Sequence, residues 1–256
     1  MLVDSHCHLH DREFFSEEQA EAMLKRAHQM GVKKIICIGT DANDSLAARD
    51  FAKTHEDIYW TYGIHPENTN CEQLKYDFPR DVLANSIKPI AIGEVGLDYH
   101  YDGYNREAQI KLLEEMLQLA ADSDLPLSFH VREAFDDFFA VIKNHPTARG
   151  VVHSFSDSKK NLKRILNETD FYVGVNGLAT YSTLPTPPLE RILLETDAPF
   201  LTPEPFRGII NEPGYIRNIA EWLSQKLAVS FEVVEKETTN NAERLFRFSD
   251  PILREE

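Results

Sequence analysis

The chain has 256 residues, of which 42% are hydrophobic and 27% are charged. This composition excludes an intrinsically disordered chain, because enough apolar side chains are present to form a core. The 42 acidic residues outnumber the 27 Lys and Arg, so the net charge is −15, which excludes a broad basic surface that would bind nucleic acid by counterion release. A small phosphate-bearing substrate held by metal ions stays compatible with this charge, since bound cations reverse the local field.

Short β-branched runs alternate with longer segments of helical periodicity along the whole chain. The runs predict strands at Leu2–Asp4, Lys34–Ile38, Ile58–Thr61, Ile90–Ile92, Leu127–His130, Gly150–His153, Phe171–Gly174 and Ile192–Leu194. The amphipathic segments predict helices at Glu17–Met30, Ser45–Lys53, Asp81–Ser86, Arg106–Ser123, Ala134–Asn144, Lys159–Leu166, Glu212–Leu227 and Phe231–Phe246. Alternation of this kind is typical of parallel strands joined by helices.

About eight strand–helix units in one chain favour a TIM-type (β/α)8 barrel of the α/β class, with extra helices at the C-terminal end. An open doubly wound sheet is the alternative, because periodicity does not reveal strand order. We find no low-complexity tract or Gly/Ser-rich linker, and therefore expect a single domain over residues 1–256.

The cysteines indicate a reducing compartment. Cys7, Cys37 and Cys71 are odd in number and scattered, so no disulfide framework is expected. No stretch approaches the ~18–20 apolar residues of a membrane span. We therefore expect a cytoplasmic protein with no membrane association and no obligate protein partner.

The segment Asp4–His8 carries the first candidate site. His6 and His8 lie two residues apart at the end of the first predicted strand, so their side chains point the same way while Cys7 faces the opposite side. Two imidazoles placed like this can bind one divalent cation. Alone the motif is weak, because pairs of histidines also occur in cores and on surfaces, and Cys7 is expected to be a buried thiol.

Further candidate ligands stand at the ends of other predicted strands. They are His65, Glu94, His130, His153 and Asp197. In a parallel barrel the carboxyl ends of all strands meet at one face, which is the face that carries active sites. We therefore expect residues spread over nearly two hundred positions to form one metal site.

Charge and position suggest a role for each ligand of a two-metal site. His6, His8 and Asp197 would hold one ion, His130 and His153 the other, and Glu94 could bridge both. Two such ions polarise the scissile group and lower the pKa of a bound water. Asp197 is the best candidate general base for that water. The mixture of imidazole and carboxylate ligands leaves Zn²⁺, Mn²⁺ and Mg²⁺ open.

The same residues lie in motifs that resemble those of the TatD-related metal-dependent deoxyribonucleases, a family of amidohydrolase-like TIM barrels. The motifs are DSHCHLH at Asp4–His10, GIHP at Gly63–Pro66, GEVGLDYH at Gly93–His100, LSFHVREA at Leu127–Ala134, HSFS at His153–Ser156, ETDAPFLTP at Glu195–Pro203, RGIINEP at Arg207–Pro213 and TTNNAERLF at Thr238–Phe246. The resemblance implies divalent metals and hydrolysis of phosphodiester bonds, often from the 3′ end of DNA. It makes His6, His8, Glu94, His130, His153 and Asp197 metal ligands.

The resemblance also suggests two substrate-binding residues. His65 would be a polar residue that faces the substrate or leaving group, with a part in catalysis beside Glu94 and Asp197. Arg132, two residues past His130, could contact a phosphate through its planar guanidinium, and the alternative for it is an ion pair with a neighbouring carboxylate.

Several positions depart from the family pattern in ways that oppose a polyanionic substrate. Ser154 and Asp157 stand where the family has a Cys and a Gly, and Ile209 and Ile210 stand where basic residues are common. Asn176 lies near the place of a frequent lysine. The leading hypothesis is a metal-dependent nuclease acting on single-stranded DNA ends or another phosphodiester. A small-molecule ester, amide or lactone hydrolase, and a metal-binding protein without activity, are the alternatives.

Three polar stretches are interpreted as structural. Asp98 and Tyr99 would form a turn with an ion pair to Arg106 at the start of a helix. Asn211–Pro213 would begin the C-terminal helix, with Pro213 in its first turn. Thr238–Asn241 is interpreted as a turn followed by a helix N-cap.

Overall fold

The computed structural model describes residues 1–70 and 87–248 of the chain. Cys71 and the predicted helix at Asp81–Ser86 lie outside the described residues. Eight strands are parallel and are hydrogen-bonded in the order β1 to β8. Their bounds are β1 Leu2–Cys7, β2 Val32–Cys37, β3 Ile58–Tyr62, β4 Ala91–Asp98, β5 Leu127–Arg132, β6 Gly150–Val152, β7 Tyr172–Val175 and β8 Ile192–Leu194. Each predicted strand is thus present, and β1 and β4 extend several residues beyond the prediction.

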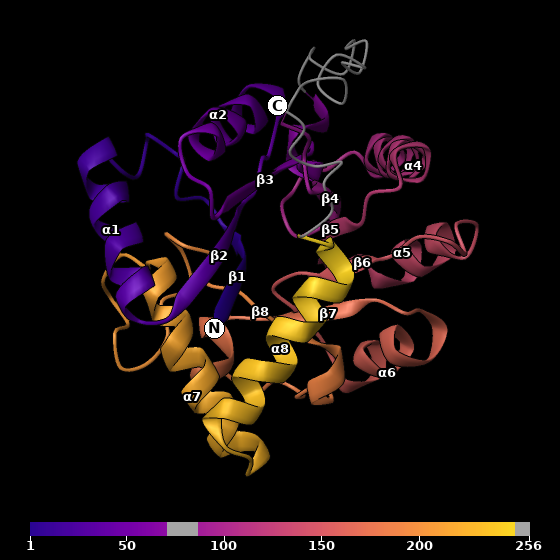
Figure 1. Cartoon of the computed structure of the whole chain (residues 1–256). Helices are drawn as coiled ribbons and strands as arrows, with labels where there is room; N and C mark the ends of the chain where they lie inside the picture. Colours follow the sequence, from indigo (N-terminus) through magenta and orange to yellow (C-terminus); the bar gives the residue numbers. More distant parts are fainter. Residues whose placement is uncertain (71–86, 249–256) are drawn as a thin grey trace.

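Helices surround these strands (Figure 1). The α-helices are α1 Glu17–Gln29, α2 Ala42–Lys53, α4 Arg106–Ser123, α5 Phe135–Ile142, α6 Lys159–Glu168, α7 Ile216–Leu227 and α8 Phe231–Phe246, and the 3-10 helices are η1 Pro66–Asn70, η3 Gly177–Thr180, η4 Leu189–Arg191 and η5 Pro213–Tyr215. The start and end of α4 match the prediction, because Asn105 caps its first turn and its buried side chains form one stripe. None of the helices in the described part of the chain is long and apolar enough to cross a membrane.

The two ends of the strand order meet. The backbone N–H of Asp197 donates to the carbonyl of His6 at 2.8 Å, and the N–H of His8 donates to the carbonyl of Ala198 at 2.8 Å. The Ser5 hydroxyl donates to the carbonyl of Leu194 at 2.9 Å. The strands therefore form a nearly closed barrel, as predicted. An open doubly wound sheet is wrong for this chain, because the strand order runs in sequence and never reverses.

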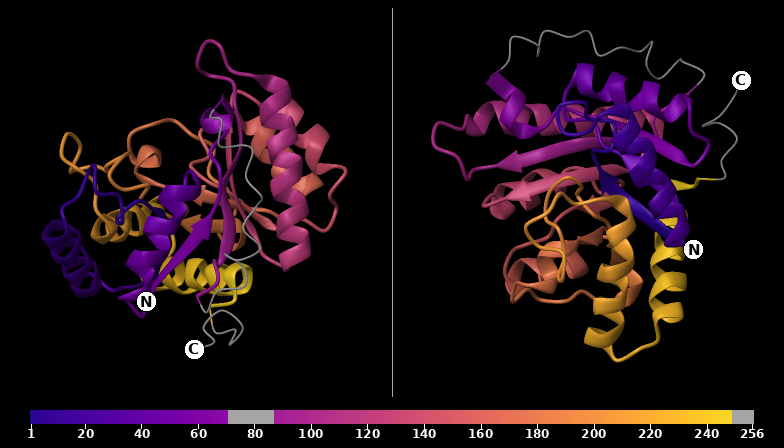
Figure 2. Two further views of the ribbon diagram at one scale, coloured as in Figure 1. Left: turned by 90° about the horizontal axis from the view of Figure 1, so that it is seen from above. Right: turned by 90° about the vertical axis from the view of Figure 1, so that its left-hand side faces the viewer.

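Helix α8 covers the amino-terminal end of the barrel, where it crosses in front of the strands in Figure 1. Ala242, Leu245 and Phe246 of α8 belong to the same buried apolar cluster as residues of the strands, among them Val3 and Leu193. Helix α7 lies beside α8, as both views of Figure 2 allow the reader to follow. Among the described residues, no helix crosses the carboxyl-terminal end of the barrel. The candidate ligands lie at that end.

One prediction at this end of the chain is wrong. Thr238–Asn241 lies inside α8 and forms neither a turn nor an N-cap. The Thr238 hydroxyl donates to the carbonyl of Val234 at 2.8 Å, and the Asn241 amide donates to the carbonyls of Leu189 and Ile192 at 2.9 Å each. These bonds satisfy polar side chains that would otherwise favour a break in the helix. The prediction for Pro213 holds, since it occupies the first turn of η5, directly before α7.

Candidate metal centre

The structure brings the six predicted metal ligands together at the carboxyl ends of the strands. His6 belongs to β1, Glu94 to β4 and His130 to β5, while His8, His153 and Asp197 follow β1, β6 and β8. Five of the six line one pocket of about 720 Å³, together with His65. His6 is completely buried beneath them.

The carboxylate of Glu94 lies at the centre of this group. Its Oε1 is 2.8 Å from Nδ1 of His130 and 2.9 Å from Nε2 of His153. Its Oε2 faces the other way, 3.4 Å from Nε2 of His6. On that side, Oδ1 of Asp197 lies 3.7 Å from Nε2 of both His6 and His8. One carboxylate therefore separates two sets of nitrogen and oxygen ligands.

The hydrogen bonds around His8 and His6 fit a cation site. Nδ1 of His8 lies 3.1 Å from the carbonyl of Ile38, an acceptor that requires the proton on Nδ1 in a neutral ring. Nε2 then presents its lone pair to the Asp197 carboxylate. Nε2 of His6 is buried and has no hydrogen-bond partner among the described residues. Lone pairs that face one another without a proton between them are the arrangement that a divalent cation satisfies.

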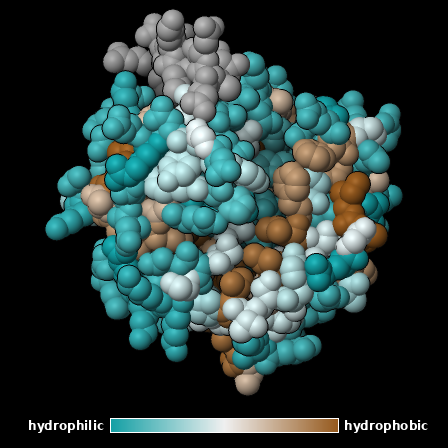
Figure 3. Space-filling view, turned by 180° about the vertical axis from the view of Figure 1, so that it is seen from behind, coloured by the Kyte–Doolittle hydropathy of each residue, from teal (hydrophilic) through white to brown (hydrophobic). Residues whose placement is uncertain are grey.

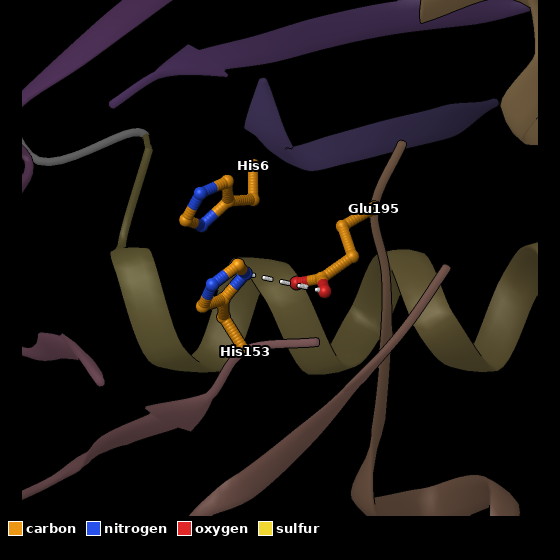
Figure 4. A group of neighbouring side chains, drawn as sticks. All are labelled: His6, His153 and Glu195. Carbon is orange, nitrogen blue, oxygen red and sulfur yellow. Dashed lines mark ion pairs between the residues drawn. The ribbon is translucent and has the colours of Figure 1, made fainter. Parts of the chain in front are cut away.

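Glu195 lies directly behind His153, as Figure 4 shows, with the ring of His6 stacked on that of His153 at a centroid distance of 3.7 Å. Oε1 of Glu195 is 3.5 Å from Nδ1 of His153 and accepts the backbone N–H of Ser154 at 2.6 Å. The carboxylate is completely buried. A carboxylate on one imidazole nitrogen orients the other toward a metal, so Glu195 directs Nε2 of His153 toward Glu94.

Asp98 plays the same part for His130. Its Oδ2 is 2.8 Å from Nε2 of His130, whose Nδ1 faces Glu94. The predicted ion pair between Asp98 and Arg106 is therefore wrong. Arg106 instead pairs with Asp137 of α5, because Asp98 is the last residue of β4 and its side chain is buried inside the barrel mouth.

Sequence reasoning gave no functional role to Asp98 or Glu195, although strand parity offered a signal for Asp98 and closeness in sequence to Asp197 offered one for Glu195. Asp98 is four residues past Glu94 on one strand, and Glu195 is two residues before Asp197. An even separation along one strand places side chains on the same face.

The electrostatics of the pocket keep Glu94 ionised and His6 neutral, as a metal requires, but favour a protonated His153. Burial would raise the pKa of Glu94, but the positive charge of His153 and the hydrogen bonds from His130 and His153 hold it well below its usual range. Burial lowers the pKa of His6, and lowers that of His65 to about 4. Burial also acts to lower the pKa of His153, but the charge of Glu94 and the bond to Glu195 raise it well above its usual value. A cation would displace the proton that His153 then carries.

The backbone next to the ligands is unusual. Asp197 and Ser154 have φ of 59° and 46°, in the left-handed region that non-glycine residues rarely adopt. Such conformations cluster at functional sites, where surrounding structure holds them. Two glycines make room: a Cβ on Gly96 would lie 1.8 Å from the carbonyl oxygen of His130, and one on Gly174 would lie 2.3 Å from Oε2 of Glu195.

The two predicted substrate-binding residues stand at the same pocket. Nε2 of His65 lies 3.6 Å from Oε1 of Glu94, so this histidine is also close to the ligands. Arg132 lines the pocket at the end of β5. Its guanidinium lies over the ring of Tyr101 at 5.3 Å, and no ion pair joins it to a carboxylate among the described residues. Its Nη1 donates to the Tyr101 hydroxyl at 3.4 Å, and its other donors are available to a ligand.

Comparison with known proteins identifies the family. The profile of the TatD related DNase family matches residues 3–247. The chain belongs to this family. The uncharacterized metal-dependent hydrolase YabD of Bacillus subtilis is 31% identical over 259 residues, which cover 97% of this chain and all of YabD. A Pantoea ananatis protein named 3′-5′ ssDNA/RNA exonuclease TatD is 30% identical over 262 residues, which cover 96% of this chain and 99% of that protein.

A solved structure agrees with these relatives. The crystal structure of YjjV, a TatD homologue of Escherichia coli, superposes with a TM-score of 0.83 at 31% identity and covers 96% of this chain and 98% of its own. This TatD family member is therefore a metal-dependent hydrolase with the barrel fold of the family. Groups of His and Glu side chains lie close enough together to bind metal, among them His6, His8 and Glu94, and His65, Glu94 and His130.

Proposed function

We propose that this TatD family member is an exonuclease that uses two divalent cations to remove nucleotides from the 3′ ends of single-stranded DNA. The observation that carries the proposal is the position of Glu94, whose two carboxylate oxygens face two different sets of imidazoles. The name of the Pantoea relative supports a nucleic-acid substrate for this chain. A cytoplasmic location and activity without an obligate protein partner remain part of the proposal.

Each residue of the centre receives a role in this mechanism. His6, His8 and Asp197 would hold one cation, His130 and His153 would hold the other, and Glu94 would contribute to both sites. When bound, Mg²⁺, Mn²⁺ or Zn²⁺ would activate water and stabilise charge on the departing oxygen.

The remaining roles concern the proton and the phosphate. Asp197 lines the pocket. Burial acts to raise its pKa, but the bond to His8 and the charge of His153 lower it, so the carboxylate stays ionised. It would act as the general base that accepts a proton from water. His65 is neutral and faces the leaving group. Arg132 binds a non-bridging phosphate oxygen through its planar fork.

The experiment is digestion of single-stranded oligonucleotides carrying a label at either the 5′ or the 3′ end, with Mg²⁺ or Mn²⁺. Stepwise loss from the 3′ end, abolished by a chelator, is expected. Glu94→Gln should lower the rate more than about 100-fold, because it removes the bridging charge. Glu107→Gln, the same change at an exposed residue of α4, is the matched control. Full activity in Glu94→Gln contradicts the bridging role.

A small-molecule hydrolase is the second candidate, favoured by the charge of the pocket. Six carboxylates, from Asp11, Asp44, Glu67, Glu94, Asp98 and Asp197, line it, against one guanidinium among the described residues. A panel of carboxylic esters, amides and lactones tested beside bis(p-nitrophenyl) phosphate separates the two. Faster turnover of a carboxylic ester or amide than of any phosphodiester would replace the exonuclease proposal.

A further inference from the structure

Three aromatic rings stand exposed around the metal centre. Phe14, Tyr101 and Phe200 are 43%, 55% and 47% exposed, and all three line the pocket that contains Glu94. Figure 3 shows apolar side chains at the surface of the face opposite α8. Large apolar residues that stay exposed around one pocket indicate a ligand-binding site. Their exposure forgoes the stabilisation that burial in the core would give, and a bound ligand can supply that burial instead.

Phe14 and Phe200 form one aromatic pair. Their rings meet edge to face, with centroids 5.3 Å apart and an interplanar angle of 81°. The ring of Phe200 is also 6.3 Å from that of His8. Phe14 lies between β1 and α1, and Phe200 follows β8. The contact between the two phenylalanines therefore holds both rings in place beside His8 and Asp197.

Tyr101 and Arg132 form a second group, with the guanidinium over the phenol ring and Nη1 of Arg132 3.4 Å from the Tyr101 hydroxyl. They follow β4 and end β5. The barrel runs in order from β1 to β8, so the junction of β4 and β5 lies across the mouth from the junction of β8 and β1. The candidate ligands lie between the two aromatic groups.

The charge of the pocket limits how a polynucleotide can be recognised. With six carboxylates and one guanidinium in its described lining, the pocket cannot bind a phosphate backbone over several nucleotides by positive charge. The faces of the bases offer another contact, since stacking on aromatic rings is uncharged and tolerates any base. An unpaired end can leave the stack and present both faces of its last base, whereas pairing and a neighbouring base hold the last base of a duplex in place.

We propose that Phe14 and Phe200 form a stacking platform for the terminal base, with Tyr101 and Arg132 holding the next nucleotide, so that the site selects unpaired ends by their base faces. This inference rests on the proposed exonuclease function and names the feature of the substrate that is recognised. The rings position the last phosphodiester over Glu94 and take no part in the chemistry.

The test uses an oligonucleotide with 2-aminopurine at its 3′ end, since the fluorescence of this base falls when it stacks. A phosphorothioate in the last linkage slows cleavage. We expect quenching with the metal-loaded protein and with Tyr104→Ala, a matched control because Tyr104 is an exposed ring that does not line the pocket. Phe200→Ala and Phe14→Ala should lose the quenching, and Phe200→Trp should keep it.

Hydrolysis of unmodified single strands gives the second readout. Phe200→Ala should lower kcat/KM by about 5- to 150-fold, mainly through KM, which corresponds to the loss of one stacked base. The wild-type protein should degrade a blunt duplex more slowly than a single strand. Circular dichroism and thermal melting of each variant check that it folds; the exposed positions make large losses of stability unexpected.

The outcomes separate this inference from the proposed function. Single-strand digestion that Phe200→Ala and Phe14→Ala leave unchanged overturns the stacking platform and keeps the exonuclease. Quenching lost only in the two phenylalanine variants, without hydrolysis by any form, supports the platform and overturns the exonuclease. If the wild-type protein neither quenches nor cleaves the oligonucleotide, both proposals are wrong.

Discussion

Replacing Glu195 by glutamine tests how strongly one buried carboxylate behind His153 tunes metal binding. The side chain has no exposed surface, and its Oε1 lies within 3.5 Å of both Nδ1 of His153 and the Asn176 amide. Glutamine keeps the volume but removes the charge, and its NH₂ group can displace the imidazole proton from Nδ1 to Nε2. A proton on Nε2 would compete with the cation.

Loss of a carboxylate that orients a metal-binding histidine costs about 10- to 100-fold in metal affinity, equivalent to about 1.4–2.7 kcal/mol. Competition with a fluorescent chelator for Mn²⁺ or Zn²⁺ measures this directly. Glu190→Gln, an exposed position in η4, is the control. Melting of the metal-free variant isolates any effect on folding alone. Unchanged affinity in Glu195→Gln, with Glu94→Gln strongly weakened, would refute the reasoning.

Three further predictions concern stability. Removing metal with a chelator should lower Tm by roughly 8–16 °C, because a ligand at 1,000 times its Kd stabilises by about 4 kcal/mol; an unchanged melting curve would argue against a bound cation. Burial acts to lower the pKa of His10, but its bond to Asp44 and the neighbouring Cys37 raise it from 6.5 to about 9. This stabilisation is complete below pH 6.5 and is lost as pH rises through 9, so the free energy of unfolding should fall by about 3 kcal/mol across that window, and Asp44→Asn should flatten the profile in urea titrations. Arg26→Ala should cost about 1–3 kcal/mol in the same titrations, because it leaves the 8% exposed carboxylate of Glu212 without its partner; a loss below 0.5 kcal/mol would show that water replaces the arginine.

Much of the fold could be predicted because it depends on local patterns. The β-branched runs marked all eight strands, and the stripe of apolar residues in Arg106–Ser123 marked α4 to the residue. The candidate site could be predicted for a related reason. A parallel barrel gathers strand ends by topology alone, so the convergence of His8, Glu94 and Asp197 needed no knowledge of individual contacts.

The features that the sequence did not predict are side-chain contacts between residues far apart in the chain. Thr238 and Asn241 look like turn residues until Val234, Leu189 and Ile192 supply acceptors for their side chains. Asp98 looked like a partner for a nearby arginine, yet it binds His130 of the neighbouring strand. The pairing of Phe14 with Phe200 likewise joins segments far apart in the chain. Contacts between residues far apart in the chain cannot be predicted from local composition.

The position of α8 has a consequence for how the protein is made. Helix α8 contacts β1, and its Thr239 hydroxyl donates to the carbonyl of Met1. The first and last described elements of the chain therefore pack against each other. A ribosome adding ~5–20 residues per second releases β1 roughly 10 to 50 s before α8 emerges. Until α8 emerges, the apolar strand residues that pack against Ala242, Leu245 and Phe246 stay exposed to solvent. We expect nascent chains stalled before α8 to need a chaperone and to be degraded readily by proteases.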